Sequence, residues 1–210
     1  MAGLQKQEAP PSALPLVTLP LRDPRKSQLE SVLGLQMMSI RQQDIFPHGM
    51  CYWNVDAVVH RYGGSAVVGW QCIWWPDRLL VAIHHAIWKK PNGELLDITQ
   101  KDCGDLGHDT SFCEDTSVAV DLLWPMFVPN KYVILRADKE IGKAVSAFQE
   151  QIEAAREAVD YVKRKEGTFF PGKGLSLPSG TMPRTIRNRI HTANVRRQRA
   201  VQKCLARAAV

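Results

Sequence analysis

The stretch HHAIWKKPNGELLDIT, residues 84–99, places two adjacent histidines and an aspartate on either side of a tight turn. Proline directly before Asn-Gly favours a three-residue hairpin loop over residues 91–93, with glycine in the left-handed region. Lys90 then lies opposite Glu94, and the turn fixes the register of the two flanking strands. We therefore expect an antiparallel hairpin in this part of the chain.

That register decides which histidine faces the aspartate. Partners across a strand pair share one face of the sheet, and alternate residues of one strand share it as well. With His85 opposite Thr99, the side chains of His85 and Asp97 are diagonal neighbours within reach of a hydrogen bond. A two-residue Asn-Gly loop would select His84 instead. The proline favours the longer loop, so the sequence predicts His85 as the partner of Asp97.

A helix is predicted to begin at or just before Cys51. Its apolar positions recur on one face, which is expected to point toward the core: Cys51, Val55, Val58, Val59 and Tyr62. The Gly-Gly pair that follows supplies a stop signal. A cysteine in the first turn has its thiolate stabilised by the free N–H groups and by the helix dipole.

These features together suggest a nucleophilic site. An aspartate that holds one histidine nitrogen protonated leaves the other nitrogen free to take a proton from a nucleophile. The hypothesis is that Cys51 attacks an amide or ester carbonyl, His85 acts as base and then as acid, and Asp97 orients His85. Taken singly, each residue has a commoner structural explanation, and only their order and register favour catalysis.

Three short motifs carry a resemblance to a known family. GMCYWNV around Cys51, HHAIW around His85 and GELLDIT around Asp97 resemble the transglutaminase-like branch of the papain-like thiol enzymes. The similarity covers roughly residues 49–99 and extends to uncharacterised bacterial and phage proteins. It implies an α+β fold with a papain-like core, in which a helix packs on an antiparallel sheet and further helices follow at the C-terminus. It also implies thioester chemistry on a protein or peptide substrate, by hydrolysis or acyl transfer, without a cofactor.

A site of this kind needs a donor for the oxyanion. The backbone N–H of Cys51 is one candidate, and members of the resembled family use an upstream glutamine. Gln43 is the candidate for that role, with Gln42 as the alternative. Three residues near these motifs are candidates for lining the cleft, although the tryptophans are also typical core residues: Trp53, Asn54 and Trp70.

The chain is expected to form a single core with additions at both ends. The segments are a flexible N-terminal arm (1–22), an α+β core (23–137), a long amphipathic helix packed on the core (138–166), a connector rich in glycine and proline (167–183) and a basic C-terminal helix (184–210). Within the core we expect a helix from about residue 23 to the Pro-Gly break at 45–50, strands over 65–75, 78–89, 93–99 and 131–137, and a polar loop over 101–115.

The net charge of +6 is unevenly distributed. Nine of the 27 lysines and arginines follow Glu166, where there is no acidic residue, so the first 166 residues hold 18 basic against 21 acidic side chains. The C-terminal helix suggests an alternative function, a non-enzymatic binding protein that grips nucleic acid or an acidic protein partner. The residues that would make such contacts are Arg187, Arg189, Arg196, Arg197, Arg199 and Lys203. A solvated helix that docks on the core is the plainer interpretation.

Composition narrows the classes of protein to which the chain could belong. Apolar residues make up 45% and charged residues 23%, as in ordinary globular proteins. No apolar run approaches the length of a spanning helix and no secretory signal is present, so we expect a cytoplasmic protein without membrane contact. Cys103, His108 and Cys113 have a spacing that could hold zinc, but a fourth ligand is not evident and a polar loop is the favoured interpretation.

Overall fold

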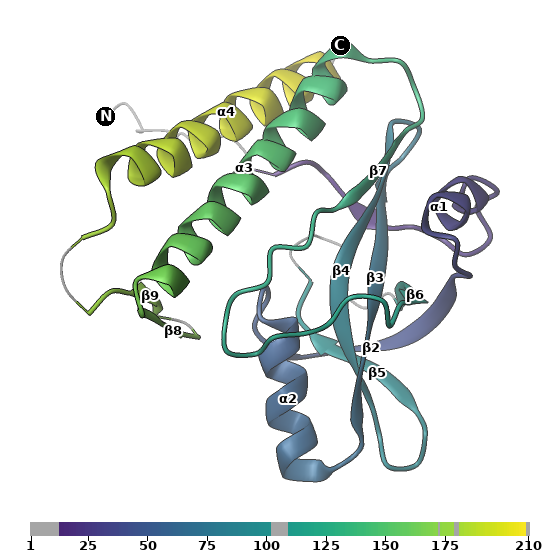
Figure 1. Ribbon diagram of the computed structural model, residues 1–210. Helices are drawn as coiled ribbons and strands as arrows, with labels where there is room; N and C mark the ends of the chain where they lie inside the picture. The colour runs from purple at the N-terminus through teal and green to yellow at the C-terminus, as the bar shows by residue number, and fades with distance from the viewer. Residues whose placement is uncertain (1–12, 102–108, 172, 179–180, 209–210) are drawn as a thin grey trace, which may run out of the picture.

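The computed structural model describes residues 13–101, 109–171, 173–178 and 181–208 (Figure 1). It is a mixed α/β structure whose elements follow in chain order: β1 (Val17–Thr18), α1 (Lys26–Leu33), β2 (Met38–Phe46), α2 (Cys51–Tyr62), β3 (Ser65–Trp75), β4 (Leu79–Lys89), β5 (Leu95–Thr99), β6 (Thr110–Glu114), β7 (Lys131–Ile134), α3 (Lys139–Arg164), β8 (Thr168–Phe170), β9 (Gly174–Ser176) and α4 (Arg184–Ala208).

Five of the described strands close into a small barrel. β3 pairs with β4 along its whole length and with β6, and the ring is completed through β2 and β5. Gly69 permits this closure, because a Cβ there would stand 2.0 Å from the carbonyl oxygen of Cys113 on β6. The pairing of β2 with β5 is parallel, so the expected antiparallel sheet is in fact a mixed one.

The hairpin between β4 and β5 has the predicted register. Lys90 N donates to Glu94 O at 2.8 Å, and Trp88 and Lys89 pair with Leu96 and Leu95. Gly93 takes the positive φ of 89° that the three-residue loop requires. The turn chemistry therefore set the strand pairing as expected.

The inside of the barrel has an apolar end and a polar layer. The apolar end is formed by side chains from all five strands: Ile40, Val67, Ile87, Leu95 and Phe112. Four of these strands carry a polar side chain two positions from the apolar one, and therefore on the same face of the strand: Gln42, His85, Asp97 and Thr110. Side chains fill the interior of a barrel this small, so the polar layer lies directly on the apolar one.

Helix α2 packs against the outside of the barrel, where Val55 and Val58 meet Ala86, Leu96 and Ile98 of β4 and β5. Figure 1 shows α2 running alongside these strands, with its first turn near the middle of the molecule. The predicted start at Cys51 is confirmed. This packing brings the N-terminus of α2 to the mouth of the barrel.

Two barrel strands differ from the sequence prediction. The helix expected from residue 23 ends at Gly34, whose φ of 70° makes a left-handed C-cap, and residues 38–46 form β2 instead of continuing it. The polar loop expected over 101–115 contains β6 at residues 110–114. Both strands are defined by pairing partners distant in sequence, which a local pattern does not reveal.

The described part of the N-terminal arm is extended and packs against the core. Leu14 is 6% exposed and Leu19 is fully buried, and β1 pairs with β3 through Val17 and Thr18. Apolar residues between the prolines of this segment therefore contribute to the core, which its lack of periodicity concealed.

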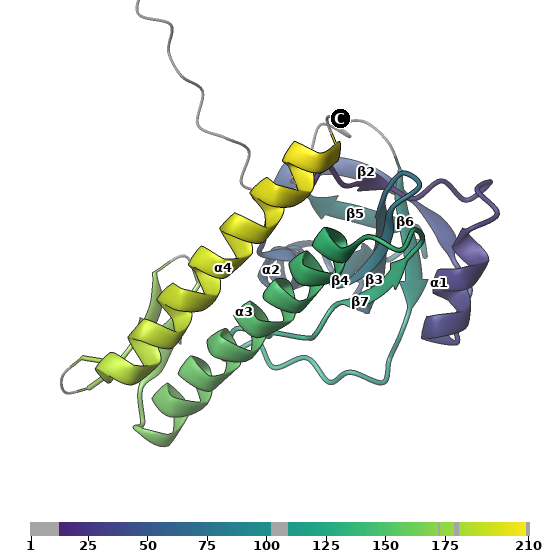
Figure 2. The same cartoon turned by 90° about the horizontal axis from the view of Figure 1, so that it is seen from above.

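The two long helices predicted near the C-terminus are confirmed as α3 and α4. They pack side by side and lie across the end of the β3–β4 ribbon (Figure 2). Their buried residues meet Leu79 and Val81 of β4 through Ile141, Ala144, Val201 and Cys204. The connector between them contains a short hairpin, β8–β9, that the sequence did not predict.

Candidate functional site

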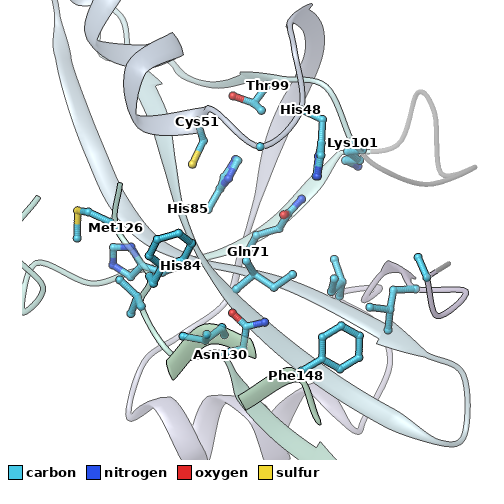
Figure 3. A pocket seen from close by; sticks show the side chains of 18 of the residues that line it. His48, Cys51, Gln71, His84, His85, Thr99, Lys101, Met126, Asn130 and Phe148 are labelled. Atoms are coloured by element: carbon cyan, nitrogen blue, oxygen red, sulfur yellow. The ribbon is translucent and has the colours of Figure 1, made fainter. Parts of the chain in front are cut away.

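The structure brings Cys51, His85 and Asp97 together. His85 Nε2–H donates to Asp97 Oδ1 at 3.0 Å, and Cys51 lies close enough to the same imidazole to raise its pKa. Figure 3 shows the sulfur of Cys51 and the ring of His85 turned toward each other. Because Asp97 takes Nε2, Nδ1 is the ring nitrogen left for the thiol. The imidazole thus lies between a sulfur atom and a carboxylate.

The electrostatics of this group favour a charged imidazole. Burial lowers the pKa of His85, but the charge of Asp97, the nearby Cys51 and the hydrogen bond to Asp97 outweigh it, so the pKa stands well above 6.5. Burial raises the pKa of Asp97, but His85 and the bonds from Thr110 and Thr99 hold it below 3.8. His85 and Asp97 are therefore an ion pair inside the barrel.

Asp97 is fully buried and each of its carboxylate oxygens is hydrogen-bonded. Oδ1 also accepts from the Thr99 backbone N–H at 3.2 Å, and the Thr110 hydroxyl lies 2.7 Å from Oδ2. Gln42 stands behind Thr110, with its Oε1 2.6 Å from the hydroxyl, while its Nε2 donates to Thr99 O at 2.8 Å. The carboxylate is thereby held in one orientation from three strands.

A cavity of about 420 Å³ opens beside Cys51 and His85. Figure 3 shows Cys51 and Thr99 at one end of it and Phe148 of α3 at the other. Side chains from the barrel mouth, the N-terminal segment, the chain after β6 and both C-terminal helices line it. Its size is that of a site for a small organic molecule or a short peptide segment.

Gln71 on β3 is a residue that the sequence did not single out. It lies two residues from Gly69, which pairs with His85, and on the same face, so it is a diagonal neighbour of His85. Its side chain lines the cavity (Figure 3), and none of the described residues bonds to its amide. The strand register would have found it, because Gln71 is the polar interior residue of β3 nearest His85.

The glutamines proposed upstream of Cys51 have different places. Gln43 is exposed on β2 and does not line the cavity. Its neighbour Gln42 points into the barrel, where its Nε2 donates to Thr99 O and its Oε1 lies beside the Thr110 hydroxyl. Gln43 is therefore not placed to contact a group bound at Cys51, and the upstream glutamine that the resemblance implied is not found at this position.

None of the three residues expected to line the cleft lines the cavity. Trp53 Nε1 donates to Leu122 O at 3.0 Å on the outside of α2. Asn54 is buried and ties the start of α2 to Pro47 O and Thr99 Oγ1, at 2.9 and 3.1 Å. Trp70 is 4% exposed and donates to Asp115 Oδ2 at 2.7 Å. Asn54 still contributes indirectly, since it fixes the turn that carries Cys51.

His84 points to the other side of β4, as the register requires. The Tyr52 hydroxyl lies 2.6 Å from His84 Nδ1, and the His84 ring is stacked on Tyr52 and stands edge-on to Trp70. Burial lowers the pKa of His84, which the charge of Asp115 offsets only in part. His84 is therefore the neutral member of the adjacent pair.

The basic residues proposed to bind a partner lie along α4. Arg196 and Arg189 form ion pairs with Glu150 and Glu157 of α3, at 3.0 and 2.5 Å. Arg197 lines the cavity. The rest are exposed on the helix: Arg187, Arg199 and Lys203. The buried face of α4 docks on the core, as the plainer interpretation of this helix expected.

Of the three residues with zinc-like spacing, Cys103 and His108 lie outside the described residues. Cys113 is fully buried on β6, with its sulfur 3.7 Å from the sulfur of Cys72. Within the described ranges no group of three or more histidine, cysteine, aspartate or glutamate side chains could hold a metal ion.

No family model, curated protein or solved structure matches this chain. In the part of the chain that the structure describes, no helix has the length and apolar character needed to cross a bilayer.

Proposed function

We propose that the protein is a cysteine-dependent hydrolase or acyltransferase that acts on amide or ester bonds through Cys51, His85 and Asp97. The observation that carries the proposal is the buried His85, which bonds to Asp97 through Nε2 while the sulfur of Cys51 faces the same ring (Figure 3). The proposal includes a papain-like relationship, since the nucleophile begins a helix and the base and its orienting group lie on adjacent strands. A thiol nucleophile must stay reduced, so it also includes a cytoplasmic location.

The charges support a specific sequence of steps. The thiol proton of Cys51 passes to His85, and the sulfur attacks the carbonyl carbon, forming a C–S bond. His85 then gives its proton to the departing amine or alcohol as the carbonyl is restored in a thioester. Water or an acceptor amine next attacks the thioester, loses a proton to His85, and releases the product and the thiolate. Asp97 keeps His85 oriented and stabilises its positive charge throughout.

The oxyanion formed in each attack needs donors that are fixed beforehand. The first backbone N–H groups of α2 have no partner within the helix, and that of Cys51 is the nearest to its own sulfur. The amide of Gln71, on the barrel wall beside His85, is the second donor in this proposal. The two groups approach the nucleophile from the helix and from the barrel wall.

Alkylation of Cys51 by iodoacetamide, followed by mapping of the labelled residue, tests the proposal. We expect Cys51 to react about tenfold faster than glutathione at mildly acidic pH, because His85 takes the thiol proton. The other described cysteines are almost fully buried, so labelling of Cys51 alone is not decisive and the rate must be compared.

The matched variant is Asp97→Asn, which keeps the shape of the side chain and leaves Cys51 as exposed as before. Asp97 raises the pKa of His85, so the variant should lose the imidazolium at lower pH and alkylate about tenfold more slowly near neutrality. Equal rates in the two proteins, or resistance of Cys51 to alkylation in both, would rule out the proposed thiol activation.

A further inference from the structure

The cavity continues well beyond Cys51 and His85. On the barrel wall it follows β3 and β4 from His85 past Gln71 to Ile73 and Ile83, which lie toward α3 and α4. Apolar side chains from separate segments of the chain line much of the rest: Leu14, Leu16, Met126, Phe127, Val128, Phe148 and Ile152. The polar residues His48, Thr99 and Lys101 also line the cavity, and they lie toward the end that holds Cys51 (Figure 3). A ligand bound at Cys51 would therefore extend along an apolar passage toward the C-terminal helices.

Arg197 of α4 lines the same cavity. Its guanidinium carbon lies 5.6 Å from the centre of the Phe148 ring, and its Nε is buried without a hydrogen-bond partner. Figure 3 shows Phe148 at the end of the cavity away from Cys51. Arg197 consequently places a positive charge where the apolar passage ends.

The neighbouring arginines of α4 provide a contrast. Arg196 and Arg189 point to α3 and form ion pairs with its glutamates, whereas Arg197 has no acidic partner among the described residues. No aspartate or glutamate is among the residues that line the cavity. A partly buried guanidinium without a carboxylate gains free energy when an anion supplies the missing hydrogen bonds.

We propose that the substrate is an acyl compound with an apolar body and an anionic end group, carboxylate or phosphate, held with its reactive carbonyl at Cys51 and its anion at Arg197. The inference rests on the proposed function for the position of the carbonyl. The apolar walls bind the body of the substrate by the hydrophobic effect, and Arg197 fixes its orientation through charge-assisted hydrogen bonds. One arginine of the basic C-terminal helix thus selects the substrate.

Isothermal titration calorimetry with sodium decanoate tests the anion site, using the full chain and its Arg197→Gln and Arg196→Gln variants. Decanoate should bind the wild type, and Arg197→Gln should weaken binding about 10- to 100-fold, the loss expected for charge-assisted hydrogen bonds. Arg196→Gln is the matched control, because Arg196 precedes Arg197 on the same helix but pairs with Glu150, and it should bind like the wild type. Decyl phosphate in a parallel titration distinguishes the two anions.

Absence of binding of both anions to the wild type, or equal weakening by the two substitutions, would overturn the inference. The placement of the ligand is tested by alkylation: bound decanoate should slow the reaction of Cys51 with iodoacetamide in the wild type, and the same concentration should have less effect in Arg197→Gln. Binding without any protection of Cys51 would also overturn it. Titration of decanoate into Cys51→Ala separates this inference from the proposed function. The anion site at Arg197 does not need the thiol, so decanoate should bind this variant whether or not Cys51 is a nucleophile.

Discussion

His84 and His85 are adjacent on β4 and equally buried, at 6% exposed each, yet their pKa values move in opposite directions. His85 points into the barrel and meets a carboxylate and a thiol, so its pKa rises. His84 points outward among aromatic rings, so burial dominates and its pKa falls. Burial lowers the pKa of both rings, and the partners on each face of the strand decide the direction of the net shift.

The two faces of β4 also differ in how completely their polar groups are hydrogen-bonded. On the inner face, the carboxylate of Asp97 is bonded by His85, Thr110 and a backbone N–H. On the outer face, His84 bonds to Tyr52, and its Nε2 has no hydrogen-bond partner among the described residues. A charged network therefore occupies the inside of the barrel and a neutral aromatic cluster the outside.

The largest expected effect comes from the same substitution at the two positions. His85→Phe leaves the fully buried Asp97 without its cation and should cost about 3–5 kcal/mol of unfolding free energy. His84→Phe keeps an aromatic ring in the outer cluster and loses one hydrogen bond, so it should cost about 1 kcal/mol. Urea unfolding of both variants measures the difference, and equal losses would show that the two faces are not distinct.

The pH dependence of stability sharpens this test. Because the pKa of His85 is raised in the folded state, its contribution is fully present below pH 6.5 and is lost as the pH rises through the higher folded value. The pKa of Asp97 is lowered in the folded state. Its contribution to the free energy of unfolding is therefore fully present above pH 3.8 and is lost as the pH falls through the pKa of the folded state. The wild type should therefore lose more stability than His85→Phe when the pH is raised from 6.5 into the alkaline range.

An intermediate effect is expected on β6, where Thr110 faces the barrel and Ser111 faces outward. Thr110→Val removes the hydroxyl beside Asp97 and should cost about 1.5–3 kcal/mol, because the bond is to a charged group. It should also slow alkylation of Cys51, though less than Asp97→Asn. Ser111→Ala removes a bond to Leu19 O at 2.5 Å, should cost about 1 kcal/mol, and should leave the alkylation rate unchanged. A slower rate in Ser111→Ala would contradict the separation of the two faces.

The smallest effect is expected for Tyr52→Phe. The variant loses the hydroxyl that bonds to His84 and should lower the unfolding free energy by about 1 kcal/mol. Proton NMR titration of the two histidines checks the assignment: the change in pKa should be larger for His84 than for His85. A larger change at His85 would mean that the outer cluster acts on the His85–Asp97 pair.

Local signals in the sequence were sufficient to predict the β4–β5 hairpin and the long helices. Pro91 followed by Asn-Gly fixed the loop, the loop fixed the strand register, and the register placed His85 beside Asp97. The periodicity of α2, α3 and α4 was equally clear because each helix carries its own apolar stripe. The position of Cys51 in the first turn of α2 followed from the same pattern.

The supporting residues of the site could not be found in this way. β2 and β6 form because each pairs with strands distant along the chain, so Gln42 and Thr110 gave no local sign that they would surround Asp97. Gln71 needed the register of β3 against β4, which makes it a diagonal neighbour of His85.

The sequence by itself determined that Cys51 begins a helix and that the hairpin brings His85 beside Asp97, because turn and helix signals act over a few neighbouring residues. Only the tertiary structure decided that the barrel closes around Asp97 and that α4 brings Arg197 to the far end of the cavity. Those contacts join segments far apart along the chain. They form because burying their shared apolar surfaces outweighs the entropy lost in closing the intervening loops.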